Sequence, residues 1–269
     1  MRGMRFVSLT STDPAFNLAV EEVLVRADDG RDVVMLWQNH RTVVIGRNQD
    51  AQAQVNRDVL KSEGITLVRR LSGGGAVYHD DGNLNFSVIT RGVGSIKPDF
   101  SFFTQPLIEA IGKFGVKATF SGRNDVEVDG KKICGNAQYR WRDTVMHHGA
   151  ILFDTDLSVL ARVLKPKERQ SKGFKGVKSH VSRVVNLREY LNCSLEEFRG
   201  VLTDCLLAQA QAQGSPDCPI ASDGAQLSDA ELRAAHDLAD LRYRHDSWNW
   251  RAVGRAGDEE YREESGQNE

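Results

Sequence analysis

The sequence predicts an α+β fold in which mixed, mainly antiparallel β-sheets are flanked by helices. Short runs rich in β-branched residues recur along the chain, and clusters of Gly, Asp and Asn separate them. Asp129 and Gly130 stand between two such runs and are a strong signal for a β-hairpin, whose strands are antiparallel. Longer segments with helical character lie at residues 15–26, 99–114 and 195–212. The chain therefore combines helices with sheets.

The composition indicates a globular protein with a sizeable core. A length of 269 residues fits one large domain, or one domain plus a small one, and the contents of 40% hydrophobic and 27% charged residues are ordinary for this class. A net charge of −2 gives no overall attraction to nucleic acid or membranes. No apolar run approaches the ~20 residues of a membrane span, and the N-terminus lacks the apolar segment of a signal peptide. We therefore expect a cytoplasmic protein that binds neither nucleic acid nor membrane.

The first helix, residues 15–26, follows a short N-terminal strand. Thr12 or Asp13 is suited to cap this helix, and the proline after them fits its first turn. The apolar residues gather on one broad side, and Glu21 and Glu22 are expected to point outward. This pattern predicts a scaffold helix packed against the core.

Two apolar runs, residues 33–37 and 42–45, look like a pair of buried strands. Trp37, at the end of the first run, is either a core residue or a wall of a ligand pocket. A short helix at residues 56–63 and a strand at residues 65–70 follow. These two elements lead into a glycine-rich stretch.

Three consecutive glycines at residues 73–75 come directly after this strand. Because they lack a Cβ, the backbone can take positive φ and approach a ligand closely, and successive N–H groups can form an anion-binding concavity. Arg70 stands just upstream, and its planar guanidinium suits phosphate or carboxylate. A strand resumes at residues 76–78, a polar turn covers residues 79–83, and the next strand covers residues 84–90. Taken alone, the stretch also fits a solvated glycine-rich turn, and it matches neither the P-loop nor the dinucleotide fingerprint.

The rest of the chain adds further helices and strands. Asp99 or Ser101 starts the helix that ends near residue 114, and Pro106 should lie in the first turn of this helix or kink it. The remaining elements are a strand at residues 147–153, a helix at residues 156–164, and a helix at residues 229–241 with Ser228 as its cap and Glu231 at capping-box spacing.

Two neighbouring lysines follow the hairpin turn. Side chains alternate between the two faces of an extended strand, so Lys131 and Lys132 should point to opposite sides. Simple alternation places Lys132 on the side of Cys134 and Lys131 on the side of Ile133. By residue type alone, both lysines would be solvent-exposed.

Several separated strings resemble the signatures of one family, the lipoate–protein ligase A family. Residues 69–85 are similar to its R-R-x-S-G-G-G-A-V-[YF]-H-D-x-G-N-x-N signature, and residues 132–137 are similar to its K-[IV]-S-G-x-A motif. The resemblance runs from about Phe6 to about Trp250. The family itself belongs to the larger group of biotin, lipoate and octanoyl protein ligases and transferases. Further similar strings are Gly-Arg-Asn-Asp at residues 122–125, His-His-Gly-Ala-Ile-Leu at residues 147–152, and the segment at residues 175–187.

The resemblance implies the biotin/lipoate protein ligase catalytic-domain fold for residues 1–253. The charged segment at residues 254–269 is almost free of apolar residues, and we expect it to be a disordered tail. Many ligases of the family continue into a small accessory domain. A separate accessory ligase subunit is therefore an expected partner of this chain.

The implied activity is ATP-dependent activation of lipoate to lipoyl-AMP, followed by transfer of the lipoyl group to a lysine of an apo lipoyl domain or related carrier protein. Joining a carboxylate to ATP brings two anions together and spreads charge onto the α-phosphate. Fixed donors and cations aimed at that phosphate supply most of the stabilisation in such reactions. Lys132, Arg70, the amides of residues 73–75 and Mg²⁺ are the groups expected to do so.

The same resemblance assigns the site residues. Lys132 is the catalytic lysine that contacts both the acyl carboxylate and the α-phosphate. Asp125 is the expected ligand of Mg²⁺, which proteins usually hold with one or two carboxylates plus substrate phosphates. The pair at His147 and His148 is a weak metal candidate, because neighbouring strand residues face opposite ways and no third ligand is near. The residues expected to bind lipoate and ATP are Arg70, Ser72, Gly73, Gly74, Gly75, Ala76, Val77, Tyr78, His79, Asn83, Asn124, Gly135, Ala137, His148, Gly149, Lys178 and Ser182.

Residues 162–183 carry many lysines and arginines and a single acid, Glu168. Charge alone is compatible with a solvated loop or a nucleic-acid surface, although no basic–aromatic pattern supports the latter. The family resemblance implies a loop that closes over the adenylate and excludes water, with Lys178 and Ser182 in contact with it. A basic loop would also suit an acidic lipoyl domain.

Two other functions remain open from the sequence. An ATP-independent transferase, taking octanoyl or lipoyl groups from an acyl carrier or a lipoylated protein, would need a thiol nucleophile, and Cys134 is the candidate. The family usually has Ser at this position, so Cys134 is also explained as a small isostere. The third possibility is a protein of this fold that only binds or senses its ligand. The four cysteines show no metal-ligand spacing, and reduced thiols are expected.

Overall fold

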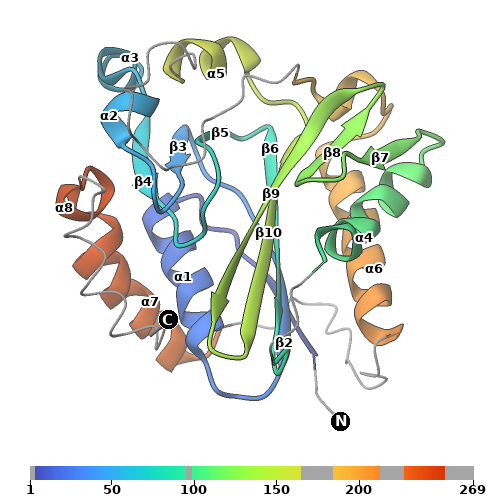
Figure 1. Ribbon diagram of the computed structural model, residues 1–269, viewed down its shortest axis with the longest axis horizontal. Coiled ribbons are helices and arrows are strands. Elements are labelled where there is room, and N and C mark those ends of the chain that lie inside the picture. Colours follow the sequence, from blue (N-terminus) through green and yellow to red (C-terminus); the bar gives the residue numbers. More distant parts are fainter. Residues whose placement is uncertain (1–3, 95–98, 165–183, 213–226, 252–269) are drawn as a thin grey trace.

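The computed structural model describes residues 4–94, 99–164, 184–212 and 227–251, and confirms the predicted α+β architecture with mixed, mainly antiparallel sheets (Figure 1). The basic loop with Lys178 and Ser182, and the segment at residues 254–269, lie outside the described residues. Among the helices that are described, none combines the length and the apolar character that crossing a membrane requires.

The larger sheet runs through the centre of the described chain. Its pairs are antiparallel except for the first, in which β1 and β2 are parallel. The hairpin of β9 and β10 is the longest feature of this sheet (Figure 1). In spatial order the seven strands are β1 (Met4–Ser8), β2 (Asp32–Trp37), β6 (Asn83–Thr90), β10 (Thr144–Leu152), β9 (Lys131–Trp141), β8 (Asp125–Val128) and β7 (Ala118–Phe120).

A smaller sheet of three strands lies beside it, in the order β4 (Thr66–Arg69), β3 (Thr42–Ile45) and β5 (Val77–His79). The prediction that residues 33–37 and 42–45 pair with each other is therefore wrong. The first run pairs with β1 and β6 in the large sheet, whereas the second pairs with β4 and β5. The four residues between them, which include Arg41 at φ 33°, carry the chain from one sheet to the other instead of closing a hairpin.

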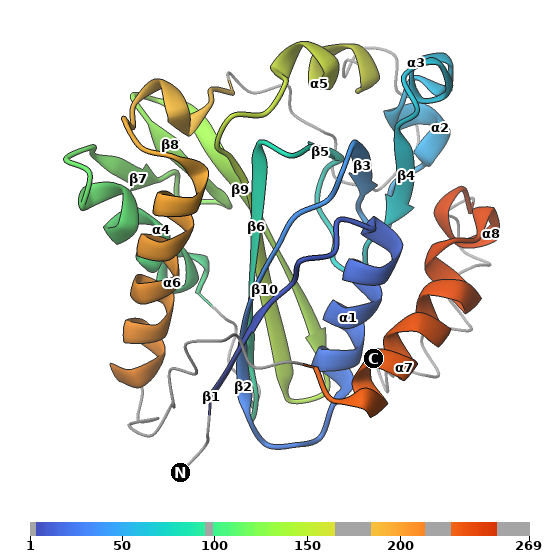
Figure 2. The same cartoon turned by 180° about the vertical axis from the view of Figure 1, so that it is seen from behind.

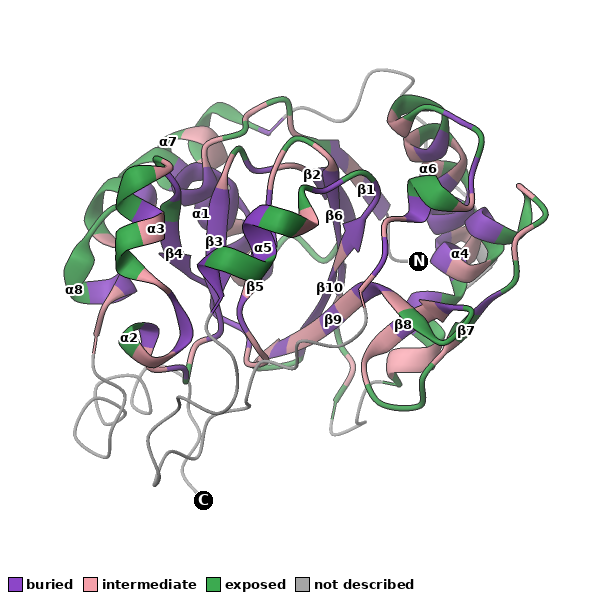
Figure 3. Ribbon diagram, turned by 90° about the horizontal axis from the view of Figure 1, so that it is seen from above, coloured by how far each residue is buried: buried purple, intermediate pink, exposed green. Residues whose placement is uncertain are grey.

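Helices cover both faces of the large sheet (Figures 1 and 2). One face is covered by α1 (Pro14–Arg26), on which α7 (Asp229–Leu238) packs from outside, and the other face is covered by α4 (Phe100–Gly112) and α6 (Leu195–Ala212). Seen from above, the buried strands lie between helices whose outer surfaces are exposed (Figure 3). The shorter helices are α2 (Ala51–Gln54), α3 (Arg57–Ser62), α5 (Leu157–Val163) and α8 (Asp246–Asn249), with a 3₁₀ turn at Leu187–Glu189 and a π turn at Ala239–Tyr243.

The predicted helix caps are confirmed at both ends of the chain. The Asp13 carboxylate accepts a hydrogen bond from the Ala15 amide, and Pro14 occupies the first turn of α1. Ser228 and Glu231 form the reciprocal capping box at the start of α7. This helix ends at Leu238, earlier than predicted, because the chain continues there as the π turn.

Pro106 lies inside α4 and not in its first turn. A proline has no N–H, so the carbonyl four residues earlier, that of Phe102, receives no helical hydrogen bond from it. Gln209 of α6 supplies the missing donor, since its Nε2 lies 2.8 Å from the Phe102 oxygen. The proline therefore creates a tie between α4 and α6.

Arg69 fastens the C-terminal segment to the small sheet. Its side chain is fully buried, and it donates to the carbonyls of Gly46, Arg47, Gln49, Trp248, Asn249 and Arg251. These six backbone oxygens take the place of a carboxylate partner. Burial nevertheless lowers the pKa of Arg69 to about 9.

Candidate active site

A cavity of about 690 Å³ lies between the two sheets, a size that suits a small-molecule ligand. We call it the central cavity. Residues of β3 and β5 form one wall, and residues of β2, β6, β9 and β10 form the other. It is lined by Leu18, Trp37, Val44, Arg70, Gly73, Gly74, Gly75, Ala76, Val77, His79, Asn85, Phe100, Ser121, Arg123, Asn124, Asp125, Glu127, Lys132, Gly135, Asn136, Ala137, Gln138, His148, Gly149 and Ala150.

The floor of the central cavity is a single row of cross-strand partners. Trp37 pairs with Asn85, Asn85 with Ala150, Ala150 with Gly135, and Gly135 with Asp125. Residues paired in this way face the same side of a sheet, and each step between strands spans roughly 4.8 Å. Because Ala150 and Gly135 are small, the middle of the row leaves room for an extended ligand between the aromatic end and the acidic end.

The triple-glycine turn is organised by Arg70. This buried guanidinium donates to the carbonyls of Gly73 and Gly75 at 2.7 and 2.8 Å, to Val44 at 3.2 Å, and to the Ser72 hydroxyl at 2.9 Å. The expectation that Arg70 aims its donors at phosphate is therefore corrected in one respect: at least four of its contacts are with the protein itself. Burial lowers the pKa of Arg70 to about 10, so it stays charged at neutral pH.

Because Arg70 holds the carbonyls of the turn, the amides are left for a ligand. Within the described chain, no group accepts a hydrogen bond from the N–H of Gly73, Gly74 or Gly75. Gly74 has φ +93°, which disfavours any side chain, and a Cβ on Gly46 would lie 2.3 Å from the Gly74 oxygen. The triple-glycine turn is thus packed directly on Gly46, with its amides unpaired among the described residues.

A β-bulge decides where Lys132 points. Val126 pairs with Cys134 but Glu127 pairs with Lys132, so Ile133 is an extra residue on β9. The bulge turns Lys132 to the side of Gly135, where its Nζ lies 2.7 Å from the Asp125 carboxylate. Gly135 makes this possible, since a Cβ there would lie 2.7 Å from the same nitrogen. Lys132 and the triple-glycine turn therefore line one cavity.

The prediction that Cys134 shares the side of Lys132 is wrong, because the bulge cancels simple alternation. Cys134 is fully buried in the core beneath α4 and α6 and does not line the central cavity. Burial raises the pKa of its thiol well above the usual range. A buried, protonated thiol is a poor nucleophile. The other described cysteines, Cys193 and Cys205, are also buried.

A chain of buried hydrogen bonds lies behind the cavity wall. His148 Nδ1 lies 2.8 Å from the Glu21 carboxylate, and His148 Nε2 lies 2.7 Å from the Ser72 hydroxyl. The same Glu21 oxygen accepts from Ser87, whose hydroxyl in turn accepts from the Trp37 indole at 3.0 Å. This chain links the aromatic end of the cavity to the turn that Arg70 organises.

The expectation that Glu21 and Glu22 point outward is wrong, since both are almost completely buried. Helix α1 lies between the large sheet and α7, so it has no solvent-facing side at these positions. Glu21 contacts His148, whereas Glu22 pairs with Arg242 and accepts from the Tyr243 hydroxyl at 2.7 Å. Glu21 is thus a residue of the site that amphipathic patterning missed.

The two neighbouring histidines face opposite ways, as alternation predicts. His147 is stacked on Phe86 and Phe103 away from the cavity, and its Nε2 lies 3.2 Å from the Asn136 amide oxygen. Burial lowers its pKa to about 3, so it is neutral. Among the described residues, no three His, Cys, Asp or Glu side chains converge as a metal site.

Three predicted ligand residues do not line the central cavity. Ser72 lies behind the wall and bonds Arg70 and His148. Tyr78 faces the core between β3 and α5, because it alternates with Val77 and His79 on β5. Asn83 is buried and donates to the Ile151 carbonyl. Lining residues that were absent from the predicted list of ligand residues include Leu18, Val44, Asn85, Phe100, Glu127 and Gln138. Asn85 is the final residue of the signature at residues 69–85, so the motif itself could have indicated it.

Asn124 both lines the central cavity and supports its wall. It lines the cavity, and its amide donates to the Asn136 carbonyl at 3.2 Å. Asn136 returns the bond by donating to the Asn124 carbonyl at 3.0 Å. This reciprocal pair holds the segment before β8 against β9, next to Lys132 and Asp125.

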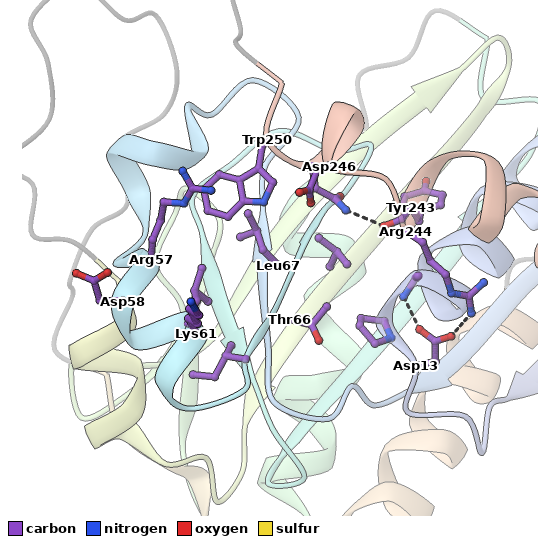
Figure 4. A pocket seen from close by; sticks show the side chains of 16 residues that line it. Asp13, Arg57, Asp58, Lys61, Thr66, Leu67, Tyr243, Arg244, Asp246 and Trp250 are labelled. Carbon is purple, nitrogen blue, oxygen red and sulfur yellow. Dashed lines mark hydrogen bonds and ion pairs between the residues drawn. The ribbon is translucent and has the colours of Figure 1, made fainter.

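A second hollow, of about 780 Å³, lies between α3, β4 and α8 (Figure 4). Arg57 stacks on the Trp250 ring at 4.3 Å, and Arg244 pairs with Asp13. None of the predicted site residues lines this hollow, and acidic and basic groups are mixed around it. The central cavity is therefore the candidate active site despite its smaller volume.

Known proteins are similar to this chain in sequence. The sequence profile of the lipoyl protein ligase A/B catalytic domain matches residues 13–207. The lipoate-protein ligase LplJ of Bacillus subtilis is 38% identical over 241 residues, which cover 88% of this chain and 70% of that protein.

Solved structures share the fold over most of the chain. The Thermoplasma acidophilum protein Ta0514 with bound lipoic acid superposes with a TM-score of 0.76 at 27% identity, covering 93% of this chain and all 100% of its own. A bipartite lipoate protein ligase of the same organism, studied with its E2 lipoyl domain, gives 0.76 at 26% identity and covers 93% and 97%. A lipoate-protein ligase A bound with ATP also gives 0.76, at 28% identity, and covers 93% and 99%.

These matches confirm the predicted family, the predicted fold and the predicted enzyme class. The chain belongs to the lipoate–protein ligase family, through its lipoyl protein ligase A/B catalytic domain.

Proposed function

We propose that this chain activates lipoate with ATP to form lipoyl-AMP and then transfers the lipoyl group to a lysine of an apo lipoyl domain. One observation carries the proposal. The Lys132 ammonium and the unpaired amides of the triple-glycine turn, which are far apart in sequence, line the same cavity. A cation and a backbone anion cradle facing one space suit a reaction between a carboxylate and a phosphate.

We assign different steps of adenylation to different residues along the floor of the cavity. The acyl chain lies over Ala150 and Gly135, with its carboxylate directed to Lys132. The amides of residues 73–75 hold the α-phosphate, and Arg70 keeps them in place by binding their carbonyls. Lys132 then stabilises the charge that develops as the carboxylate oxygen attacks phosphorus and pyrophosphate leaves.

The acidic end of the cavity fits Mg²⁺. Asp125 and Glu127 lie two residues apart on β8 and both line the cavity, so their carboxylates face it together. Bound with substrate phosphates, the ion would neutralise phosphate charge there. Lys132 partly compensates the charge of these carboxylates through its 2.7 Å contact with Asp125.

In the second step the acceptor lysine attacks the activated carbonyl, and AMP leaves. The acceptor protein is proposed to be a lipoyl domain, as in the Thermoplasma system, whose ligase is bipartite. A separate accessory subunit is proposed for this chain for the same reason. We further propose a catalytic domain at residues 1–253, a flanking tail at residues 254–269, and a cytoplasmic location.

The ATP-independent transferase would need a reactive thiol nucleophile, and the structure gives this requirement no support. Cys134, its candidate nucleophile, is buried in the opposite core, and burial raises the pKa of the thiol. Cys134 is better explained as a small core residue at a position where the family usually has Ser.

The test is incubation with lipoate, Mg-ATP and an apo lipoyl domain, with the mass of the acceptor measured before and after. The proposal predicts a mass increase of one lipoyl group that requires ATP. A parallel reaction contains an octanoyl carrier protein and no ATP. Acyl transfer in the reaction without ATP, together with no transfer in the reaction with lipoate and Mg-ATP, would contradict the proposal and favour the transferase. If the complete mixture is inactive, the proposed accessory subunit is tested by adding the equivalent domain from a single-chain relative.

A further inference from the structure

We infer that His147 is a positioning residue for the acidic end of the central cavity. It is outside the set of residues that line the cavity, and it acts by fixing the side-chain amide of Asn136. That amide holds the segment at residues 121–125, which places Asp125 beside Lys132. The inference deepens the proposed function and rests on it, since the adenylation chemistry assigned to Lys132 and Asp125 is what the ring supports.

The direction of each hydrogen bond around the ring follows from one amide. Asn136 Nδ2 donates to the Asn124 carbonyl at 3.0 Å, so its Oδ1 is the acceptor that faces the ring. His147 Nε2 lies 3.2 Å from this Oδ1 and must therefore carry the ring proton. His147 Nδ1 is then an acceptor, and Gln138 Nε2 donates to it from 3.1 Å. The ring thus bridges two amides of β9, accepting from one and donating to the other.

Aromatic side chains hold the ring in this position. The ring of His147 stacks on Phe103 with 4.9 Å between centroids and on Phe86 with 5.9 Å, and Phe100 meets it edge to face at 5.4 Å. The ring is fully buried, and burial lowers its pKa to about 3, so it is neutral. A neutral imidazole has one N–H and one lone pair in its plane, which are the two groups that the amides need.

Gly149 provides the space in which the Asn136 amide lies. The two residues are cross-strand partners on β10 and β9, and His147 is likewise the cross-strand partner of Gln138. A Cβ on Gly149 would lie 2.5 Å from Asn136 Oδ1. The amide therefore fills the space of the missing side chain, and the histidine two residues earlier on β10 sets its orientation.

The oriented amide secures the residue before β8. The Asn136 N–H and Nδ2 both donate to the Asn124 carbonyl, at 2.8 and 3.0 Å, and the Asn136 carbonyl accepts from Asn124 Nδ2 at 3.2 Å. The next residue is Asp125, whose carboxylate lies 2.7 Å from Lys132 Nζ. If the Asn136 amide turned, the bond from its Nδ2 would be lost, and Asn124 would be held less firmly next to this ion pair.

Removal of the ring nitrogens should loosen this segment. Asn136 Oδ1 would lose its N–H donor and keep the Cys134 thiol, 3.7 Å away, which is a weak donor. A buried acceptor in this state turns toward other partners, and the loss of one such hydrogen bond shifts an equilibrium by about fivefold or more. The kcat/KM for Mg-ATP should fall by about this factor. The affinity for lipoate should stay at its wild-type value, because the acyl chain is assigned to the other part of the floor.

The experiment uses two replacements of His147 and one control. His147→Phe keeps an aromatic ring against Phe86 and Phe103 but has no ring nitrogen. His147→Gln gives up the ring, yet its amide nitrogen can take the place of Nε2 and donate to Asn136. Phe103→Leu is the control, since it removes a stacking partner and leaves both hydrogen bonds of the histidine in place.

Three measurements are made on each protein: kcat and KM for Mg-ATP in lipoate-dependent pyrophosphate exchange, calorimetric binding of lipoate without ATP, and hydrogen–deuterium exchange of the free protein. His147→Phe should lower kcat/KM for Mg-ATP and speed deuterium uptake by peptides covering residues 121–126. His147→Gln should restore most of both values. Phe103→Leu should lower Tm but keep the wild-type kcat/KM for Mg-ATP and the wild-type uptake at residues 121–126.

Wild-type kinetics and uptake in His147→Phe would overturn the inference. A His147→Gln protein as impaired as His147→Phe would also overturn it, because the ring would then act through its shape and not through its N–H. If the wild type shows no pyrophosphate exchange, the proposed function fails, and deuterium uptake at residues 121–126 alone decides whether His147 holds this segment. If His147→Phe does not fold, His147→Asn replaces it, since its amide is too short to reach Asn136 Oδ1.

Discussion

Replacing Gly46 by alanine tests how closely the triple-glycine turn depends on its support. Gly46 follows directly after β3 and is outside the set of residues that line the central cavity. A Cβ at this position would lie 2.3 Å from the Gly74 oxygen and 3.1 Å from the Gly74 carbonyl carbon. Carbon atoms in ordinary contact lie about 3.5 Å or more from their neighbours, so the turn must move by about 1 Å.

This movement should have two measurable costs. Overpacking of this kind costs about 1–3 kcal/mol of folding free energy, which corresponds to a fall in Tm of roughly 3–10 °C for a protein of this size. A displacement of about 1 Å at a phosphate-holding turn reduces the rate by up to about 100-fold. The hydrogen bonds from Arg70 to Gly73 and Gly75 oppose the movement, so the turn cannot simply slide away.

The assay is lipoate-dependent ATP–pyrophosphate exchange together with thermal melting. Gly112→Ala is the control, since it replaces a glycine at the end of α4 whose Cβ would meet nothing within 4 Å. The control should melt at or slightly above the wild-type temperature, because alanine favours a helix by about 0.5–1 kcal/mol. Wild-type exchange and wild-type Tm in Gly46→Ala would refute the reasoning about the turn.

Two further predictions concern buried groups. Cys134→Ser should keep adenylation activity, because the thiol lies outside the cavity, with some loss of Tm from placing a hydroxyl in the core; complete loss of exchange by a protein with a native circular dichroism spectrum would contradict this. The stability should fall on acidification, since burial lowers the pKa of His79 and of His147 to about 3, below the ~6.5 of the unfolded chain. Their contribution is complete above about pH 6.5 and declines toward pH 3, by about 1.4 kcal/mol per pH unit for each histidine. Urea unfolding at pH 7, 6 and 5 measures it, and equal stability at pH 7 and 5 would be the contrary result.

The chemistry-bearing motifs of this protein could be located from the sequence because each is a short string with a local cause. The hairpin at Asp129 and Gly130 is an example, since both residues take positive φ, at 51° and 69°. The cap at Asp13 and the capping box at Ser228 depend likewise on neighbours a few residues away. The glycine turn is equally local, because its own Arg70 folds it.

The errors arose where distant parts of the chain decide the outcome. Glu21 carries the outward-facing pattern of an amphipathic helix, yet it faces the large sheet, where His148 and Ser87 are its partners. The prediction that β2 pairs with β3 was wrong because each of these strands pairs with other strands farther along the chain. The extra residue at Ile133 leaves no trace in composition or spacing, although it decides which side Lys132 and Cys134 face.

The role of the bulge gives the most direct test of the account as a whole. Lys131 and Lys132 are adjacent, but Lys131 is exposed and outside the cavity, whereas Lys132 lines it beside Asp125. Lipoate-dependent ATP–pyrophosphate exchange should therefore fall by about 100-fold or more in Lys132→Ala and remain near the wild-type rate in Lys131→Ala. A folded Lys132→Ala protein that exchanges as fast as Lys131→Ala would contradict the central claim that this ammonium and the glycine turn act on one phosphate.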